Sequence, residues 1–419
     1  MTSPQESLSM NKQGFSWSVG PISRSLLKNP VSAILIILQV ALTLSIVSNS
    51  LFIIDARIEK MNRPTGVVED ELLFVHPLYL GEKQDRLFQR DEDLAALRAL
   101  PGVKSVMQIN ASPLGGSNNS NTICESEIES TSTCHTDASL FMGGGKVIQS
   151  YGLTLLEGRE FFEEEIEDGR LMGGLKTSTL IITKALAEAL FPGESAIGKV
   201  VYMSEKAQTI VGVVERLQRP GALIDDDEFE FSAILPMKPS SYAPLVVRAE
   251  AESIPELAST VKSVLEAENS GRLINHVITM KEQRKQGYGD DFAMTLILSL
   301  TIVLLVIVTA LGITGLVSFS VGSRTKQIGI RRALGARKVD VLCHFLLENG
   351  LIVIVGIILG FALSYVLNQQ LMTFYELSKL EGVFVLASAL LVLMIAQLAT
   401  FFPALKASRI SPAIATRTV

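Results

Sequence analysis

Four long apolar stretches divide the chain, and one long polar segment separates the first stretch from the second. They cover residues 31–54, 292–321, 351–367 and 383–402, and none contains a charged residue. Because a helix needs about 20 apolar residues to cross a bilayer, each stretch predicts a transmembrane helix. The third is short, and residues 341–348 can extend its helix on the polar side. The first is predicted to be an uncleaved anchor, since no small-residue cleavage site follows Ile54.

The positions of lysine and arginine predict the orientation of these spans. Basic residues precede the first span, follow the fourth, and fill the connection between the second and third. Short loops rich in Lys and Arg stay in the cytoplasm, so both termini and Cys343 are expected inside. The expected cytoplasmic segments are 1–30, 322–350 and 403–419, and the expected extracytoplasmic segments are 55–291 and 368–382.

The polar segment 55–291 shows the alternation of short helices and strands that is typical of an α+β domain. Residues 93–100 predict a helix stopped by a Pro-Gly pair, and 103–109 predict the strand that follows. Near the end of the segment, PLVVRAE predicts a strand, Ser253 and Glu256 form a capping box for a helix, and HVITM predicts a second strand. The predicted fold class is an α-helical membrane protein with four transmembrane helices and a large α+β extracytoplasmic domain between helices 1 and 2.

Composition and charge agree with this division. Hydrophobic residues make up 48% of the chain. Segment 55–291 has 24 basic and 38 acidic residues, a net charge of −14, whereas the rest has 13 basic and 5 acidic, a net charge of +8. The acidic middle argues against a nucleic-acid partner, and the basic flanks suit a membrane protein.

Two of the three cysteines, Cys124 and Cys134, lie in the acidic middle segment. If that segment is exported, an oxidising compartment allows them to form a disulfide. The alternative is two free thiols in a loop rich in Ser, Asn and Thr.

No motif in the sequence predicts a catalytic, cofactor or metal site. Gly193, Gly198 and Lys199 have the spacing of a phosphate-binding loop, but Val200 replaces the required hydroxyl residue, and the segment runs from helix to strand. The carboxylate runs 163–165 and 225–228 could bind a divalent cation, although consecutive carboxylates are usually a solvated surface. The four histidines show no ligand spacing.

Three blocks of sequence resemble MacB/FtsX-type ABC transporter permeases. The most specific is SRTKQIGIRRALGARKVDVLCHFLLENGLIVIVGIILG, which is similar to the family's cytoplasmic loop and third span. The second comprises YGLTLLEGREF, LIITKALAEALFPGESAIGKVV and TIVGVVERLQ, which resemble its extracytoplasmic core. The third is the terminal PALKASRISPAIATR. Together with the order of spans, these blocks cover almost the whole chain.

The resemblance implies an inner-membrane subunit that works with a separate ABC ATPase and with a second permease subunit, identical or related. A periplasmic adaptor is a further candidate partner, and membrane lipid surrounds the spans. Because no qualified phosphate loop is present, we expect ATP hydrolysis in a separate polypeptide, and no enzymatic activity or cofactor in this chain. The expected ATPase-coupling residues are Gly329, Arg331, Arg332, Gly335, Arg337 and Lys338. The alternative is a basic loop that only fixes topology.

Small residues in the spans predict helix packing. Gly356 and Gly360 form a GxxxG step, which can pack helices within one subunit or between two. A pairing surface on the first two spans is expected to use Ser45, Ser48, Ser50, Gly312 and Gly315.

Three functions remain open at the level of sequence. One is a permease that exports or extracts an amphipathic substrate. Another is an FtsX-like mechanotransmitter that regulates a cell-wall enzyme without transport, and the third is a membrane sensor. The absence of charged residues from the apolar spans favours transmission of force over a hydrophilic channel.

Overall fold

A computed structural model describes most of the chain and divides it into two compact units. The first unit contains the chain up to Ile58 and from Ala293 onwards, and the second contains Glu59–Phe292. The described residues are 30–80, 82–116, 118–125, 136–144, 146–168, 177–203, 206–221, 228–239, 242–268, 272–375 and 379–410.

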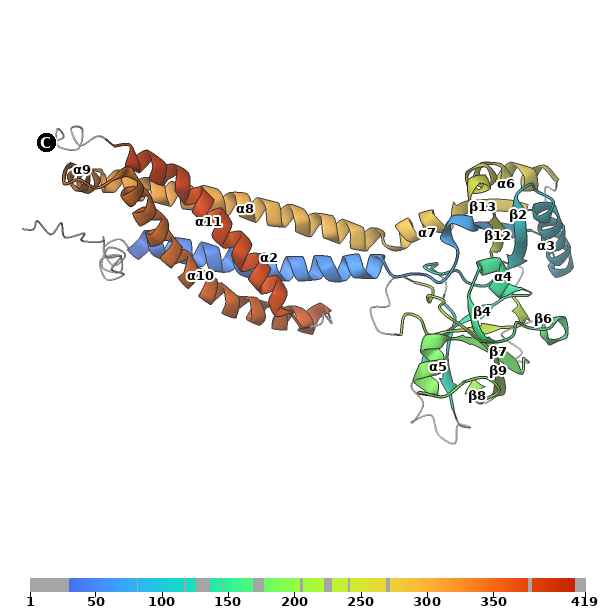
Figure 1. Ribbon diagram of the computed structural model, residues 1–419. Helices are drawn as coiled ribbons and strands as arrows, with labels where there is room; N and C mark the ends of the chain where they lie inside the picture. Colours follow the sequence, from blue (N-terminus) through green and yellow to red (C-terminus); the bar gives the residue numbers. More distant parts are fainter. Residues whose placement is uncertain are drawn as a thin grey trace, which may run out of the picture. The chain divides into compact units, whose positions relative to one another are not determined.

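The first unit is a bundle of four long helices and one short one (Figure 1). They are α2 (Pro30–Met61), α8 (Gly289–Ser323), α9 (Thr325–Ala333), α10 (Lys338–Tyr375) and α11 (Gly382–Ser408). The four long helices are long and apolar enough to cross a membrane, which confirms the four predicted spans. Each helix extends beyond its apolar stretch, because helical hydrogen bonding continues through polar residues after the hydropathy signal ends. The predicted loop 322–350 is therefore α9 and the first turns of α10.

Close packing inside the bundle uses small and hydroxyl residues. A Cβ built on Gly360 would lie 2.9 Å from Leu44 Cδ2 and 3.0 Å from the Cα of Ala41, so α10 and α2 touch through their backbones. Gly356 approaches Val40 of α2 in the same way. The GxxxG step thus packs helices within one chain.

Buried hydroxyl groups add hydrogen bonds between these helices. Thr43 and Thr309 join α2 to α8 at 2.8 Å, and Ser48 donates to Ser364 of α10 at 2.9 Å. Ser45 and Ser50 are 1% and 4% exposed. The expectation that Ser45, Ser48 and Ser50 lie on a surface that pairs with another subunit is therefore wrong. Their hydroxyl groups face the interior of their own bundle, where the chain itself excludes lipid.

The second unit contains a four-stranded antiparallel sheet of split βαβ topology. Its elements are β1 (Leu72–Tyr79), α3 (Lys83–Arg98), β2 (Val103–Gln108), β12 (Leu245–Ala249), α6 (Ile254–Glu268) and β13 (Arg272–Thr279). The strand order is β13-β1-β12-β2. The predicted strand, helix and strand near the end of the segment are confirmed, and β1 lies between the two strands.

A second sheet is inserted in the chain between β2 and β12. Its strands are β3 (Ser120–Cys124), β4 (Asp137–Met142), β5 (Leu155–Gly158), β7 (Thr179–Thr183), β8 (Val200–Met203), β9 (Lys206–Val214) and β10 (Ser232–Leu235). The order is β5-β9-β7-β10-β4-β3-β8, and β8 pairs with β9 as well. Six of these strands therefore close into a ring, which leaves β5 at the edge.

Shorter elements complete the unit. They are the 3₁₀ turns η1 (Glu69–Glu71), η2 (Glu163–Glu165) and η4 (Ala251–Ser253), the helices α4 (Val147–Tyr151), α5 (Lys184–Leu190) and α7 (Met280–Gly287), and the paired strands β6 (Glu167–Asp168) and β11 (Met237–Lys238).

Alternation along the strands of the second sheet builds two cores. Leu180 and Ile182 of β7 belong to a cluster with α5 and β8, whereas Ile181 between them packs with Phe74 of the first sheet. Successive side chains of a strand point to opposite faces, so one strand serves both cores. The two sheets consequently share a hydrophobic core and form one compact unit.

The structure also explains the false phosphate loop. α5 precedes Gly193 and β8 follows Lys199, so the predicted order from helix to strand is confirmed. Gly193 and Gly198 have φ values of 76° and 79°, a conformation that favours glycine. These glycines are required by two tight turns and present no helix N-terminus to a phosphate.

Candidate functional site

The candidate site lies in the second unit, where the segment that follows α2 meets the helix that precedes α8. The helix is α7, and its start is fixed by a capping box. Thr279 accepts a hydrogen bond from the Glu282 backbone amide at 3.2 Å, and Glu282 accepts one from the Thr279 amide at 3.1 Å. This cap sets the direction of α7 and so places Gln283 and Arg284 in its first two turns.

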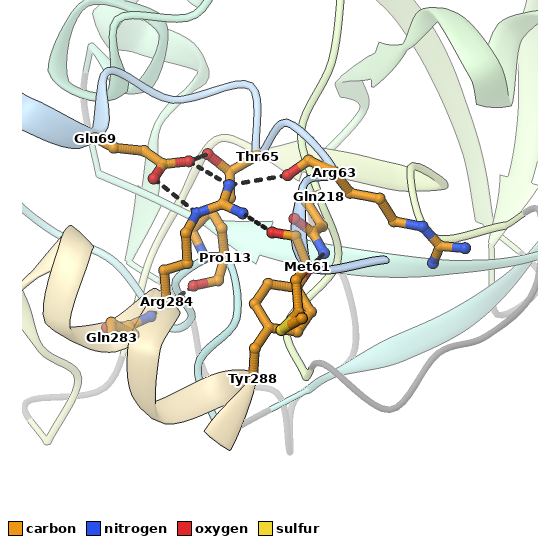
Figure 2. A network of polar contacts seen from close by, with 9 residues as sticks. All are labelled: Met61, Arg63, Thr65, Glu69, Pro113, Gln218, Gln283, Arg284 and Tyr288. Atoms are coloured by element: carbon orange, nitrogen blue, oxygen red, sulfur yellow. Dashed lines mark hydrogen bonds and ion pairs between the residues drawn. The ribbon is translucent and has the colours of Figure 1, made fainter. Parts of the chain in front are cut away.

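Arg284 is the centre of the site (Figure 2). Its Nε and Nη2 donate to the Glu69 carboxylate at 2.8 and 2.5 Å, in a two-pronged ion pair. Its Nη1 donates to the Met61 carbonyl at 2.7 Å, and Nη2 also donates to the Arg63 carbonyl at 2.9 Å. We call Arg284, Glu69 and the carbonyl groups of Met61 and Arg63 the stalk clamp. It ties the end of α2 and the segment that follows it to α7, the helix that precedes α8.

Further polar contacts brace the clamp. Lys60 and Asp291 form an ion pair at 3.8 Å, and both side chains are less than one-tenth exposed. This pair joins the last turn of α2 to the first turn of α8. Gln283 donates to Ser112 Oγ and to the Pro113 carbonyl, both at 2.6 Å.

A second contact links the start of α8 to the inserted sheet region. Gln218 donates to the Tyr288 hydroxyl at 3.0 Å, and both groups are buried. Together, the bonds of Gln283 and Gln218 attach the chain before α8 to two separate loops of the domain. A polar group buried in this way is costly to leave unpaired, so the contacts favour one arrangement.

The electrostatics keep the clamp charged. Burial acts to lower the pKa of Arg284, but the hydrogen bonds and charge of Glu69 outweigh it and raise this pKa above its usual value. Burial also raises the pKa of the Tyr288 hydroxyl, which therefore stays neutral. Hydrogen bonds to charged groups are about twice as strong as neutral ones, so the clamp is a stiff connection.

The residues predicted to contact an ATPase lie in the second half of α9, in the turn that follows it and at the start of α10. Gly335 has a φ of 101°, which the tight turn requires. Arg331, Arg337 and Lys338 are exposed, whereas Gly329 is buried. We call residues 330–339 the coupling turn.

Exposed apolar side chains accompany these cations. Leu334, Val339 and Ile330 are 83%, 63% and 47% exposed. Sequence reasoning identified the arginines of this segment and missed the apolar residues between them. The available signal was that Ile330, Leu334 and Val339 flank and separate two pairs of basic residues.

Arg332 has a different environment from Arg331. Its Nη1 donates to the Ser408 and Ile410 carbonyls at 2.9 and 2.8 Å, and so caps the end of α11. These bonds hold Arg332 within its own chain. A double charge reversal of Arg331 and Arg332 would therefore disturb the bundle as well as any docking surface.

The other predicted residues fall in several places. Gly312 faces Gln39 of α2, and Gly315 has open space where a Cβ would lie. Cys124 is disulfide-bonded and Cys343 is free, while Cys134 lies outside the described residues. Glu165 pairs with Arg159 at 2.7 Å, and residues 225–227 also lie outside the described part.

Family comparisons agree with this architecture. Residues 33–264 match the MacB-like periplasmic core domain, and residues 299–412 match the FtsX-like permease C-terminal domain. The chain therefore belongs to the MacB/FtsX family of ABC transporter permeases and is a multi-pass membrane protein.

Particular relatives include an exporter and an uncharacterised permease. The chain is 28% identical over 282 residues to the macrolide export ATP-binding/permease protein MacB of Chromobacterium violaceum, covering 66% of this chain and 42% of that protein. It is 26% identical over 219 residues to the uncharacterised ABC transporter permease YknZ of Bacillus subtilis, covering 51% and 53%. The chain thus spans less than half of the length of this MacB relative.

Two solved structures resemble the chain at lower identity. The periplasmic region of MacB from Actinobacillus actinomycetemcomitans is 14% identical, with a TM-score of 0.32, and covers 54% of this chain and 97% of its own. The extracellular domain of YknZ, described as a noncanonic ABC-type transporter from Gram-positive bacteria, is 17% identical, with a TM-score of 0.30, and covers 48% and 98%.

Proposed function

We propose that this chain is a permease subunit that couples ATP hydrolysis in a separate ATPase to movement of its outer domain, for export or extraction of an amphipathic substrate. Membership of the permease family supports the general role. The stalk clamp carries the specific proposal, because Arg284 binds the end of α2 at Met61 and also binds Glu69, which directly precedes the first sheet. A shift of either helix end is thereby passed to the domain through charged hydrogen bonds.

The coupling turn is the proposed contact with the ATPase. Leu334 and Val339 offer exposed apolar area, and Arg331 and Arg337 surround it with positive charge. Apolar anchors ringed by charge are typical of protein interfaces. The proposed orientation places this turn in the cytoplasm, both termini inside and segment 59–292 outside, in agreement with the positive-inside rule.

The test must distinguish a variant that only destabilises the protein from one that stops ATP from affecting the outer domain. The full chain is isolated from its native membrane with whatever ATPase accompanies it, and ATP-dependent hydrogen exchange of the outer domain is measured. In Arg284→Met, ATP hydrolysis should continue while the exchange difference disappears. A matched control is Arg248→Met, because Arg248 also binds a carboxylate, Glu71, at 2.7 Å and a carbonyl, that of Gln149, at 2.6 Å, outside the clamp.

The control should lose stability and keep its ATP-dependent exchange difference. Equal responses of the two variants would contradict a coupling role for the clamp. The two candidate functions, transport and regulation of a cell-wall enzyme, predict different phenotypes in cells that lack the protein. Accumulation of an amphipathic cargo supports transport, and a cell-wall defect without cargo supports the FtsX-like mechanotransmitter instead.

A further inference from the structure

A cavity opens in the membrane bundle between α2, α8 and α10. Its empty volume is about 540 Å³, including the space at its open mouth. Most of the lining is apolar and includes Ile36, Val317, Phe345 and Ile352. Apolar walls with a few polar groups are the usual composition of a ligand site. The polar groups here are grouped around the end of α8.

Arg324 and Glu348 form an ion pair in the wall of this cavity. Arg324 donates to both oxygens of the Glu348 carboxylate from Nη1, at 2.8 and 3.0 Å. Within the described part of the chain, the Nε and Nη2 hydrogens of Arg324 have no acceptor. The pair has no net charge, so the cavity favours a ligand that is itself neutral overall but carries an acceptor for Arg324.

Asn349 supplies the complementary group. It lines the cavity, is 3% exposed, and its Nδ2 donates to Thr400 Oγ1 at 2.6 Å. The Thr400 hydroxyl donates to the Ala396 carbonyl at 2.7 Å, so toward Asn349 it can only accept. This fixes the orientation of the amide. Asn349 Oδ1 is then a buried acceptor without a donor among the described residues.

We propose that this cavity binds a membrane phospholipid whose headgroup carries a primary ammonium, as in an ethanolamine phospholipid. The lipid phosphate accepts from Arg324, the ammonium donates to Asn349 Oδ1, and an acyl chain lies along Ile36 and Ile352. A choline headgroup has no N–H to donate, and a glycerol headgroup adds a net negative charge beside Glu348. The site rests on the membrane bundle alone and does not depend on the proposed transport function.

The test uses the full chain in bilayer nanodiscs that contain one of three photoactivatable lipids, with ethanolamine, choline or glycerol headgroups and identical acyl chains. Labelled peptides are mapped by mass spectrometry. The ethanolamine probe should label the cavity segment of α10, residues 345–352, about fivefold more than either other probe, the ratio that one hydrogen bond supplies. In Asn349→Leu, its labelling should fall to the choline level. Gln397→Leu also replaces an amide side chain by leucine, but on α11 at a residue that is not among those lining the cavity, and it should leave the labelling unchanged.

Competition on the unchanged protein gives a second measurement, which holds even where Asn349→Leu fails to fold. Unlabelled ethanolamine lipid should displace the probe from the cavity segment, and choline lipid should not. Equal labelling by the three probes, equal competition by both lipids, or labelling of the cavity no higher than that of the exposed α11 surface would each overturn the proposal. The last result would mean that something other than lipid fills the cavity.

Discussion

Arginines lie before the start and after the end of α8, and the two places use them in opposite ways. Before α8, Arg284 directs its hydrogen bonds to Glu69 and to two backbone carbonyls, all in its own chain. After α8, Arg331 and Arg337 are exposed beside Leu334. The first place is closed, because the guanidinium of Arg284 is bound within its own chain. The second is open, because apolar area and charge face outward.

This difference separates two tasks that a force-transmitting chain must perform. A connection between a helix and a domain must be stiff, which charged and partly buried hydrogen bonds provide. A contact with a separate subunit must be reversible, which an exposed apolar patch with a charged rim provides. Neighbouring residues can serve these two purposes separately. Arg332 caps α11 within the chain, whereas Arg331 is exposed and available to another subunit.

The largest expected effect comes from breaking the closed end. Arg284→Met leaves the Glu69 carboxylate without its ion-pair partner and removes donors from the Met61 and Arg63 carbonyls. Loss of one member of a buried pair costs about 3–5 kcal/mol, and we expect the lower part of this range because the pair is partly exposed. Thermal unfolding of the full chain in nanodiscs measures it. Asp70→Asn breaks an exposed ion pair with Lys281 and serves as the comparison. If Arg284→Met lowers the free energy of unfolding no more than Asp70→Asn does, the stalk clamp does not stabilise the domain as described.

Two glycines of the bundle allow a similar comparison, between a position packed against another helix and a position with open space around it. Gly360→Leu would force side-chain atoms into Ala41 and Leu44, and overpacking costs about 1–3 kcal/mol. Gly315→Leu meets open space and should be tolerated by the folded chain. The measurement is the detergent resistance of each variant relative to the unchanged protein. If Gly315→Leu preserves stability but reduces subunit association, Gly315 lies on the proposed pairing surface.

Acidification should weaken one strand pair of the outer domain. The rings of His76 and His276 stack at 4.0 Å between β1 and β13, and burial, followed by the charge of His276, lowers the pKa of His76 from 6.5 to about 4. The unfolded chain therefore binds this proton more readily, so stability is complete above pH 6.5 and falls as the pH drops toward 4.

After allowance for the partial exposure of His76, the loss is about 1–2 kcal/mol. Hydrogen exchange of the β1 and β13 amides at about pH 7 and about pH 4.5, corrected for intrinsic rates, measures it. His76→Asn removes the titrating group and should flatten this pH dependence. If the pH dependence of amide exchange in β1 and β13 persists in His76→Asn, protonation of His76 is not its cause.

The smallest effect on stability is expected at the open end. Leu334→Ser removes an exposed side chain and should change unfolding by less than about 0.5 kcal/mol. Association with the ATPase should nevertheless fall, because the apolar anchor of the coupling turn is lost. Lys326→Ser, a change at an exposed residue of α9 that lies outside the coupling turn, is the control. Destabilisation by Leu334→Ser would mean that the coupling turn packs within the chain.

The sequence by itself determined the elements whose signals are local. The four apolar stretches predicted the four long helices, because a helix needs about 20 apolar residues to cross a bilayer. Turn residues and strand alternation predicted β2, β12, α6 and β13, since these patterns depend on neighbouring residues only. The order from helix to strand around Gly193 and Gly198 likewise followed from sequence and excluded a phosphate loop.

The tertiary structure alone decided which residues meet. Arg284 and Met61 are separated by 223 positions, and nothing in the local sequence indicates that a guanidinium will reach that carbonyl. The capping box of Thr279 and Glu282 fixes where α7 starts, but it does not determine which residues Arg284 contacts. Ser48 was expected on a pairing surface and lies inside the bundle, because a hydroxyl residue in an apolar helix has the same pattern whether its neighbour belongs to the same chain or to another. Long-range pairing depends on the closure of the whole fold, so the clamp and the cavity beside Arg324 were both beyond sequence reasoning.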